Sequence, residues 1–166
     1  MKNALVVIDV QNHFAVEKAA GLPQKILAHI KKVPYDFMLF TKFRNDPGSN
    51  FHKILGYKKV TGPPATDIHP VLRPLSNKSN TFEKVTYSAF KDARFVDFLQ
   101  SNDIKELFIC GINIDGCVLA TAYEAFDLGY KMKILEDLCS VASFRDDYEQ
   151  SAKTIIARNL KRKTPK

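Results

Sequence analysis

Cys117 is the side chain of this sequence with the clearest capacity for nucleophilic chemistry. It follows an apolar segment at residues 105–110 and a glycine, and it lies near the start of a helical segment that Gly129 is expected to end. With Asp115 as the predicted N-cap residue, Cys117 lies near unpaired backbone N–H groups and the positive end of the helix dipole, which favours thiolate. We therefore expect a cysteine-nucleophile hydrolase, although a free cysteine is more often a small buried apolar residue.

Two charged residues fall at comparable places in the chain. Asp9 ends the apolar run at residues 4–8, and Lys84 lies near the end of a short predicted strand at residues 81–85. In open α/β sheets, ligands bind beyond the carboxyl ends of the strands. We expect both side chains to meet Cys117 at that edge, with capping of the following turn as the alternative role of Asp9.

The elements that must position these residues alternate along the chain. Apolar runs predict strands at residues 4–8, 36–43, 81–85, 105–110 and 131–135. Apolar spacing of three and four predicts helices at residues 23–32, 92–102, 115–129 and 145–160. This order predicts an α/β, three-layer Rossmann-like fold with a central, mainly parallel sheet and helices on both faces.

The length of 166 residues favours one domain, residues 1–166, with a sizeable core. Residues 44–81 contain five of the eight prolines and no clear periodicity. Such a long irregular segment is typical of a lid or a binding segment. Because it also carries aromatic and apolar side chains, we expect an ordered cover over a pocket.

Composition narrows the class of partner. The net charge is +7, and part of the excess lies in a basic tail at residues 158–166, but zinc-finger spacing and an RNA-binding signature are absent, so we expect no nucleic acid. No apolar run is long enough to span a membrane, and we expect no membrane contact. Three cysteines without a C-x-x-C pair favour a cytoplasmic setting.

The sequence also lacks the motifs of three other classes of protein. Because G-x-G-x-x-G is absent, we do not expect dinucleotide binding, and because a phosphate loop is absent, we do not expect phosphate-loop chemistry. Because G-x-S-x-G is absent, we do not expect a serine hydrolase.

Three motifs connect these observations. Residues 6–14 have the sequence V-V-I-D-V-Q-N-H-F, residues 82–90 have F-E-K-V-T-Y-S-A-F, and residues 111–129 have G-I-N-I-D-G-C-V-L-A-T-A-Y-E-A-F-D-L-G. In this order they resemble the motifs of the isochorismatase-like cysteine hydrolases, a superfamily that includes nicotinamidases and N-carbamoyl amide hydrolases. The three motifs span nearly the whole chain.

The resemblance implies a catalytic triad of Asp9, Lys84 and Cys117. Cys117 attacks an electrophilic carbon and forms a covalent intermediate, and Asp9 accepts the thiol proton and returns it to the leaving group. Lys84 holds the anionic pair together by its charge. The resemblance also implies a cis peptide bond between Ile112 and Asn113, in a loop that would bind an oxyanion, and a homo-oligomer.

The sequence departs from the family at two places. Nicotinamidases carry a metal-binding D-x-H after the second strand, which residues 41–52 lack, and the spacing of Asp46, His52 and His69 does not match it. We therefore expect no metal and no other cofactor. Asn113 and Ile114 stand where the family often has a small residue and threonine, beside the oxyanion loop.

Phe14, Tyr87 and Phe90 are the candidate walls of the substrate pocket, with core packing as their alternative role. The favoured hypothesis is a metal-independent cysteine hydrolase that cleaves a C–N bond of a small amide through a thioester-type intermediate. Two alternatives are an isochorismatase-like enol-ether hydrolase and a catalytically weak module that binds a small molecule. A redox-sensing thiol is a further alternative, which the spacing of the cysteines does not favour.

Overall fold

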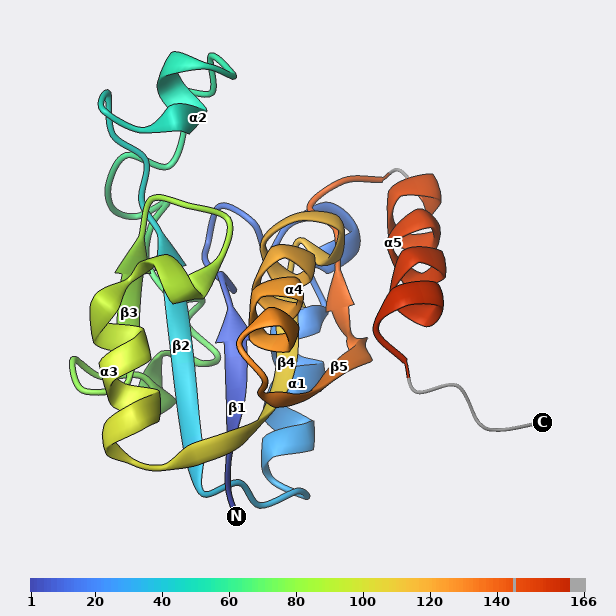
Figure 1. Cartoon of the computed structure of the whole chain (residues 1–166). Helices are drawn as coiled ribbons and strands as arrows, with labels where there is room; N and C mark the ends of the chain where they lie inside the picture. Colours follow the sequence, from blue (N-terminus) through green and yellow to red (C-terminus); the bar gives the residue numbers. More distant parts are fainter. Residues whose placement is uncertain (145, 162–166) are drawn as a thin grey trace.

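The computed structural model describes residues 1–144 and 146–161. The described residues form a sheet of five parallel strands in the order β3-β2-β1-β4-β5 (Figure 1). The strands are β1 Lys2–Ile8, β2 Phe37–Phe43, β3 Thr81–Lys84, β4 Ile104–Ile112 and β5 Lys131–Ser140. β1 lies in the centre, and its last five residues are buried, as expected for a strand that is covered on both faces.

Helices cover the sheet from both sides. They are α1 Leu22–Ile30, α3 Ala93–Ser101, α4 Leu119–Asp127 and α5 Asp146–Asn159, whereas the short α2 Asn50–Lys53 lies beyond the carboxyl ends of β2 and β3 (Figure 1). In Figure 1, α3 and α4 lie in front of the sheet, α1 lies behind it, and α5 lies beside β5. The predicted α/β fold with a parallel sheet between helices is therefore confirmed. Within the described ranges, no helix is long and apolar enough to cross a membrane.

The core between α3 and the sheet is rich in aromatic rings. The rings of Phe82 and Phe95 lie 5.4 Å apart, and those of Phe90 and Phe95 lie 5.3 Å apart, both edge to face. Phe90 is 6% exposed and belongs to this core. Its expected place in a pocket wall is therefore wrong, because the 3-10 turn at Ala89–Lys91 directs this residue towards α3.

β5 is longer than the apolar pattern predicted. The predicted strand ends at Leu135 because Glu136 and Asp137 are polar, whereas β5 continues to Ser140. The pairing with β4 shifts in register along this stretch, and the chain is buried again from Leu138 onwards. Arg145, the first residue of the predicted last helix, and residues 162–166 of the basic tail lie outside the described residues.

Gly111 allows β4 to approach β1 where both strands reach the carboxyl edge of the sheet. Its φ is +127°, which favours glycine, and a Cβ atom there would lie 2.1 Å from the carbonyl oxygen of Ile8. Ile8 precedes Asp9, and the Cys117 segment begins shortly after Gly111. This close approach therefore brings the two ends of the site together.

Candidate active site

Lys84 joins the other two predicted catalytic residues. Its Nζ donates hydrogen bonds to Asp9 Oδ2 (2.7 Å), to the carbonyl oxygen of Thr86 (2.9 Å) and to Cys117 Sγ (3.4 Å). These three bonds use the three protons of the ammonium group. The side chains of Lys84 and Asp9 are each 1% exposed, so the ion pair is screened little by water. The structure thus brings Asp9, Lys84 and Cys117 into one buried cluster.

The Asp9 carboxylate is also fixed from its other side. Thr41 Oγ1 donates a hydrogen bond to Asp9 Oδ1 (2.6 Å). Thr41 Oγ1 also accepts a hydrogen bond from the Asp9 backbone N–H (3.1 Å). Sequence reasoning missed Thr41. The signal was a polar residue in the apolar strand β2, one position beyond Phe40, which pairs with Val7 of β1. That register places Thr41 beside the end of β1.

The chain enters the cysteine helix through a wider turn than an α-helix has. Residues Ile114–Val118 form a π-helical turn, in which the Val118 N–H donates to the Asn113 carbonyl (3.2 Å), and α4 follows. Asp115 lies inside this turn, so its predicted role as the N-cap is wrong. Asn113 occupies the cap position, but its side chain accepts a hydrogen bond from the Ala142 N–H (2.6 Å). The peptide bond between Ile112 and Asn113 is cis.

A hydroxyl one turn after Cys117 ties this turn to the segment that follows β3. Thr121 Oγ1 donates to the Cys117 carbonyl (2.7 Å) and accepts from the Ala89 N–H (3.1 Å). Thr121 is fully buried. The second and third sequence motifs are therefore joined directly, which holds Cys117 at a fixed position relative to Lys84.

The Cys117 thiol is protonated at rest, whereas its place near a helix start led us to expect a thiolate. Burial, followed by the Asp9 charge, raises the pKa of Cys117 to about 12, and the opposing effect of Lys84 is smaller. Burial works against the charge of Lys84, but Asp9 and Cys117 outweigh it and raise the Lys84 pKa. The resting site therefore holds a protonated thiol beside an ion pair, because loss of water around the sulfur outweighs its cationic neighbour. The Asp9 carboxylate is also a hydrogen-bond partner of the Cys117 side chain, so it is placed to receive the thiol proton.

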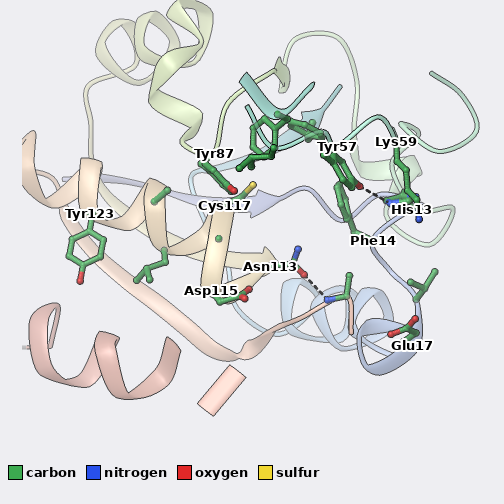
Figure 2. Close-up of a pocket in the computed structure, with 18 residues that line it drawn as sticks. His13, Phe14, Glu17, Tyr57, Lys59, Tyr87, Asn113, Asp115, Cys117 and Tyr123 are labelled. Carbon is green, nitrogen blue, oxygen red and sulfur yellow. Dashed lines mark hydrogen bonds between the residues drawn. The ribbon is translucent and has the colours of Figure 1, made fainter. Parts of the chain in front are cut away.

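Cys117 opens onto a cavity of about 940 Å³ (Figure 2). Phe14 and Tyr87, two of the predicted pocket residues, line it, and Phe90 does not contribute to its lining. A row of rings forms one wall: Tyr87 lies 4.6 Å from Phe51, Phe51 lies 4.7 Å from Phe43, and Phe43 lies 6.3 Å from Phe14. The cavity therefore suits a small, flat, partly apolar molecule next to the sulfur.

The irregular segment at residues 44–81 divides into two parts. Its first part supplies further lining residues that sequence reasoning did not single out as pocket residues, namely Phe51, Leu55, Tyr57 and Lys59. Its second part packs onto the core through Ile68 and Leu72, and Ile68 also pairs with Gln11 in an isolated bridge. The expectation that this segment contributes to the pocket agrees with the position of its first part.

The donor set in this segment does not fit a metal ion. Asp46 accepts a hydrogen bond from the Gly48 N–H (2.7 Å), and Asn45 donates to the carbonyls of Tyr57 (2.6 Å) and Lys59 (3.2 Å). Across the described ranges, no group of three or more His, Cys, Asp or Glu side chains is arranged to hold a metal. Asn45 and Asp46 thus order the backbone of the segment at residues 44–81, which we call the lid.

The chain belongs to the isochorismatase family. The model of the isochorismatase domain matches residues 3–161, which is nearly the whole chain. This family match and the similarity to nicotinamidases show that the protein is a hydrolase.

Two curated relatives and two solved structures illustrate the similarity. Nicotinamidase 3 of Arabidopsis thaliana is 29% identical, over 89% of this chain and 77% of its own. The uncharacterized isochorismatase family protein YddQ of Bacillus subtilis is 28% identical, over 87% of this chain and 81% of its own. The nicotinamidase/pyrazinamidase PncA from Bacillus subtilis has a TM-score of 0.77 and 26% identity, over 96% of both chains. An isochorismatase-like hydrolase from Alkaliphilus metalliredigens, with a TM-score of 0.79, 21% identity and 95% and 91% coverage, shares the fold.

Proposed function

We propose that this protein is a metal-independent cysteine hydrolase that cleaves the C–N bond of a small amide. The observation that carries the proposal is the contact of Lys84 Nζ with both Asp9 Oδ2 and Cys117 Sγ at the edge of an aromatic cavity. The nicotinamidase relatives, which by name act on an amide, support the same bond type. The chemistry needs only residues of this chain and water.

In this proposal Asp9 is the base for the attack. As the Cys117 sulfur bonds to the amide carbon, the thiol proton passes to Asp9, and the carbonyl oxygen becomes an oxyanion. The backbone N–H of Cys117, together with the loop of Ile112 and Asn113, stabilises this oxyanion. Lys84 keeps its positive charge beside the sulfur and the carboxyl group throughout. A thiol that is protonated at rest is consistent with this order of steps, because the proton leaves the sulfur only during the attack.

Asp9 then acts as the acid and again as the base. It returns the proton to the leaving nitrogen, the C–N bond breaks, and an amine or ammonia departs from a Cys117 thioester. Water attacks the thioester with its proton going to Asp9. The carboxylic acid product then leaves, and the proton returns to the sulfur. Each cycle consumes one amide and one water and restores the enzyme.

A screen of small primary amides tests the proposal through ammonia release. We expect wild-type protein to release ammonia from at least one amide of a size that fits the cavity, and Cys117→Ala to remain at background. Ammonia release that Cys117→Ala retains would refute the nucleophile. Pyruvate release from an enol-ether substrate that does not depend on Cys117 would favour the enol-ether alternative, and binding without turnover would favour the binding module.

A further inference from the structure

The aromatic wall of the cavity ends in a polar corner. Beyond Phe14, the ring of His13 lies 5.0 Å away, and the ring of Tyr57 lies 6.5 Å from that of His13. The Tyr57 hydroxyl and His13 Nε2 are hydrogen-bonded at 2.9 Å. Lys59 lines the same cavity, and Figure 2 shows these three side chains grouped at the end opposite Cys117 and Tyr87. We call Tyr57, His13 and Lys59 the polar corner.

The polar corner carries positive charge and hydrogen-bond donors. Burial, and then the Lys59 charge, lower the pKa of His13, which keeps its imidazole neutral near pH 7. Burial raises the pKa of Tyr57, so its hydroxyl keeps its proton. Lys59 therefore supplies the charge of the corner, and its neighbours supply neutral polar groups. One ammonium with neutral donors suits a singly charged carboxylate better than a phosphate, which carries more charge.

Neither acidic residue that lines the cavity belongs to the polar corner. Asp115 lies in the turn that carries Cys117, and Glu17 is separated from Lys59 in the view of Figure 2, with His13 between them. The chain around the corner is basic, since residues 51–59 contain three lysines and no acidic residue. The local field at this end of the cavity therefore favours an anion.

We propose that the polar corner binds a carboxylate of the substrate, so that the hydrolysed molecule is an amide with a carboxylate at its far end. The scissile amide then lies at Cys117, a flat or apolar middle part lies on the rings of Phe43 and Phe51, and the carboxylate reaches Lys59. This inference rests on the proposed function, because it places the reacting carbon at the sulfur. It makes Lys59 a specificity-determining residue.

Alkylating probes of graded length test the proposal without a known substrate. The probes are N-iodoacetyl derivatives of glycine, β-alanine and 4-aminobutanoate, each compared with its terminal carboxamide, and the readout is the rate at which Cys117 Sγ displaces iodide, followed by mass spectrometry. At the best length we expect the carboxylate probe to react about five- to tenfold faster than its carboxamide, as a favourable charge contact would give. Lys59→Gln should remove this preference, and Lys59→Arg should retain it.

Lys58→Gln is the matched control, because it removes the same charge from the neighbouring residue, which does not line the cavity. Its probe preference should equal that of wild-type protein. Equal rates for both probes at every length, or equal losses in the Lys58 and Lys59 variants, would overturn the inference while leaving the nucleophile intact. A failure of plain iodoacetamide to label Cys117 would instead count against the proposed function.

A binding measurement tests the polar corner even if iodoacetamide fails to label Cys117. The probes are 3-phenylpropanoate and its neutral counterpart 3-phenylpropanol, at millimolar concentration, and the readout is the thermal midpoint of unfolding. We expect the acid to raise the midpoint more than the alcohol, and this difference to vanish in Lys59→Gln and persist in Lys58→Gln. The same shift for both compounds in wild-type protein would overturn the inference.

Discussion

Lys84 holds the catalytic cluster together through its three hydrogen bonds. Its ammonium group contacts a carboxylate, a carbonyl and a sulfur, all within 3.4 Å. The ring of Phe43 lies 5.6 Å from the same nitrogen and shields it from water. A buried cation of this kind is stable only with its partners, and its partners are equally dependent on it.

We predict that Lys84→Met destabilises the protein far more than an exposed lysine substitution does. Removal of Lys84 leaves the Asp9 charge buried without its partner, and we expect a loss of about 3–5 kcal/mol in the free energy of unfolding. Lys91→Met is the matched control, because Lys91 pairs with Glu124 at the same 2.7 Å but is 60% exposed. Its cost should be about 1 kcal/mol or less. Urea unfolding curves that show equal losses would contradict the buried ion pair.

The sequence predicted this group well where side-chain chemistry was conspicuous. Asp9, Lys84 and Cys117 were predicted because a carboxylate, an ammonium group and a thiol stand at strand and helix ends. Thr41 was missed because a threonine in an apolar strand is unremarkable until the strand register is known. The resting charge of Cys117 was also wrong, because the burial of the sulfur depends on tertiary packing.

Strand ends and helix starts decide where these side chains point. Asp9 has a positive φ of 49° at the end of β1, and Gly111 has its unusual φ in the adjacent strand. Together they form the corner of the sheet from which the π-helical turn departs. The predicted N-cap at Asp115 was wrong because i to i−5 spacing cannot be recognised from residue types, which fit an ordinary helix start equally well.

We predict that Gly111→Ala disrupts the site, whereas Gly129→Ala is tolerated. A methyl group at Gly111 would collide with the backbone of Ile8, and we expect a loss of several kcal/mol, of order 4, or failure to fold. Gly129 also has positive φ, but nothing lies within 4 Å of its Cβ position, so only about 1 kcal/mol of backbone strain is expected. Thermal unfolding of both variants measures the difference, and a Gly111→Ala protein as stable as Gly129→Ala would refute this packing.

The lid shows where sequence reasoning reaches its limit at the scale of elements. Its irregularity and its aromatic residues predicted an ordered pocket cover. Its path depends on contacts without periodicity, such as the Asn45 amide that holds the backbone at Tyr57 and Lys59. Those contacts place Tyr57 and Lys59 in the cavity, and no residue pattern predicts them. The same holds for β5, because Glu136 and Asp137 interrupt the apolar pattern although the strand continues to Ser140.

Over the whole molecule, the alternation of strands and helices sufficed to predict the α/β fold, because each apolar run had to be buried in one sheet. The cavity could not be predicted in this way, since its lining residues come from five separate parts of the chain, between His13 at one end and Ala142 at the other. The homo-oligomer, the cytoplasmic setting and the absence of nucleic-acid partners stay predictions.

We predict that chelation leaves the molecule unchanged. The side chains of Asn45 and Asp46 are occupied by hydrogen bonds to the lid backbone, so prolonged dialysis against EDTA should shift the thermal midpoint by less than about 1 °C. Ammonia release from any amide substrate should also persist. Elemental analysis that finds one zinc per chain, with loss of stability on chelation, would contradict metal independence.

The central claim is that Asp9 takes the proton of Cys117, and the pH dependence of alkylation tests it most directly. Limiting iodoacetamide should label Cys117 before Cys110 and Cys139, which are buried and more protected. In wild-type protein the proton can pass to Asp9, so the rate should stay nearly constant between about pH 6 and pH 9, far below the raised pKa of about 12.

Asp9→Asn removes both the internal base and the negative charge that raises the thiol pKa. The pKa of Cys117 should therefore fall, and the labelling rate should climb about tenfold per pH unit until that lower pKa is reached, because only solvent can then take the proton. A flat wild-type profile with a rising Asp9→Asn profile is the result that the account predicts. A wild-type rate that climbs with the same slope, or equal labelling of all three cysteines, would contradict it.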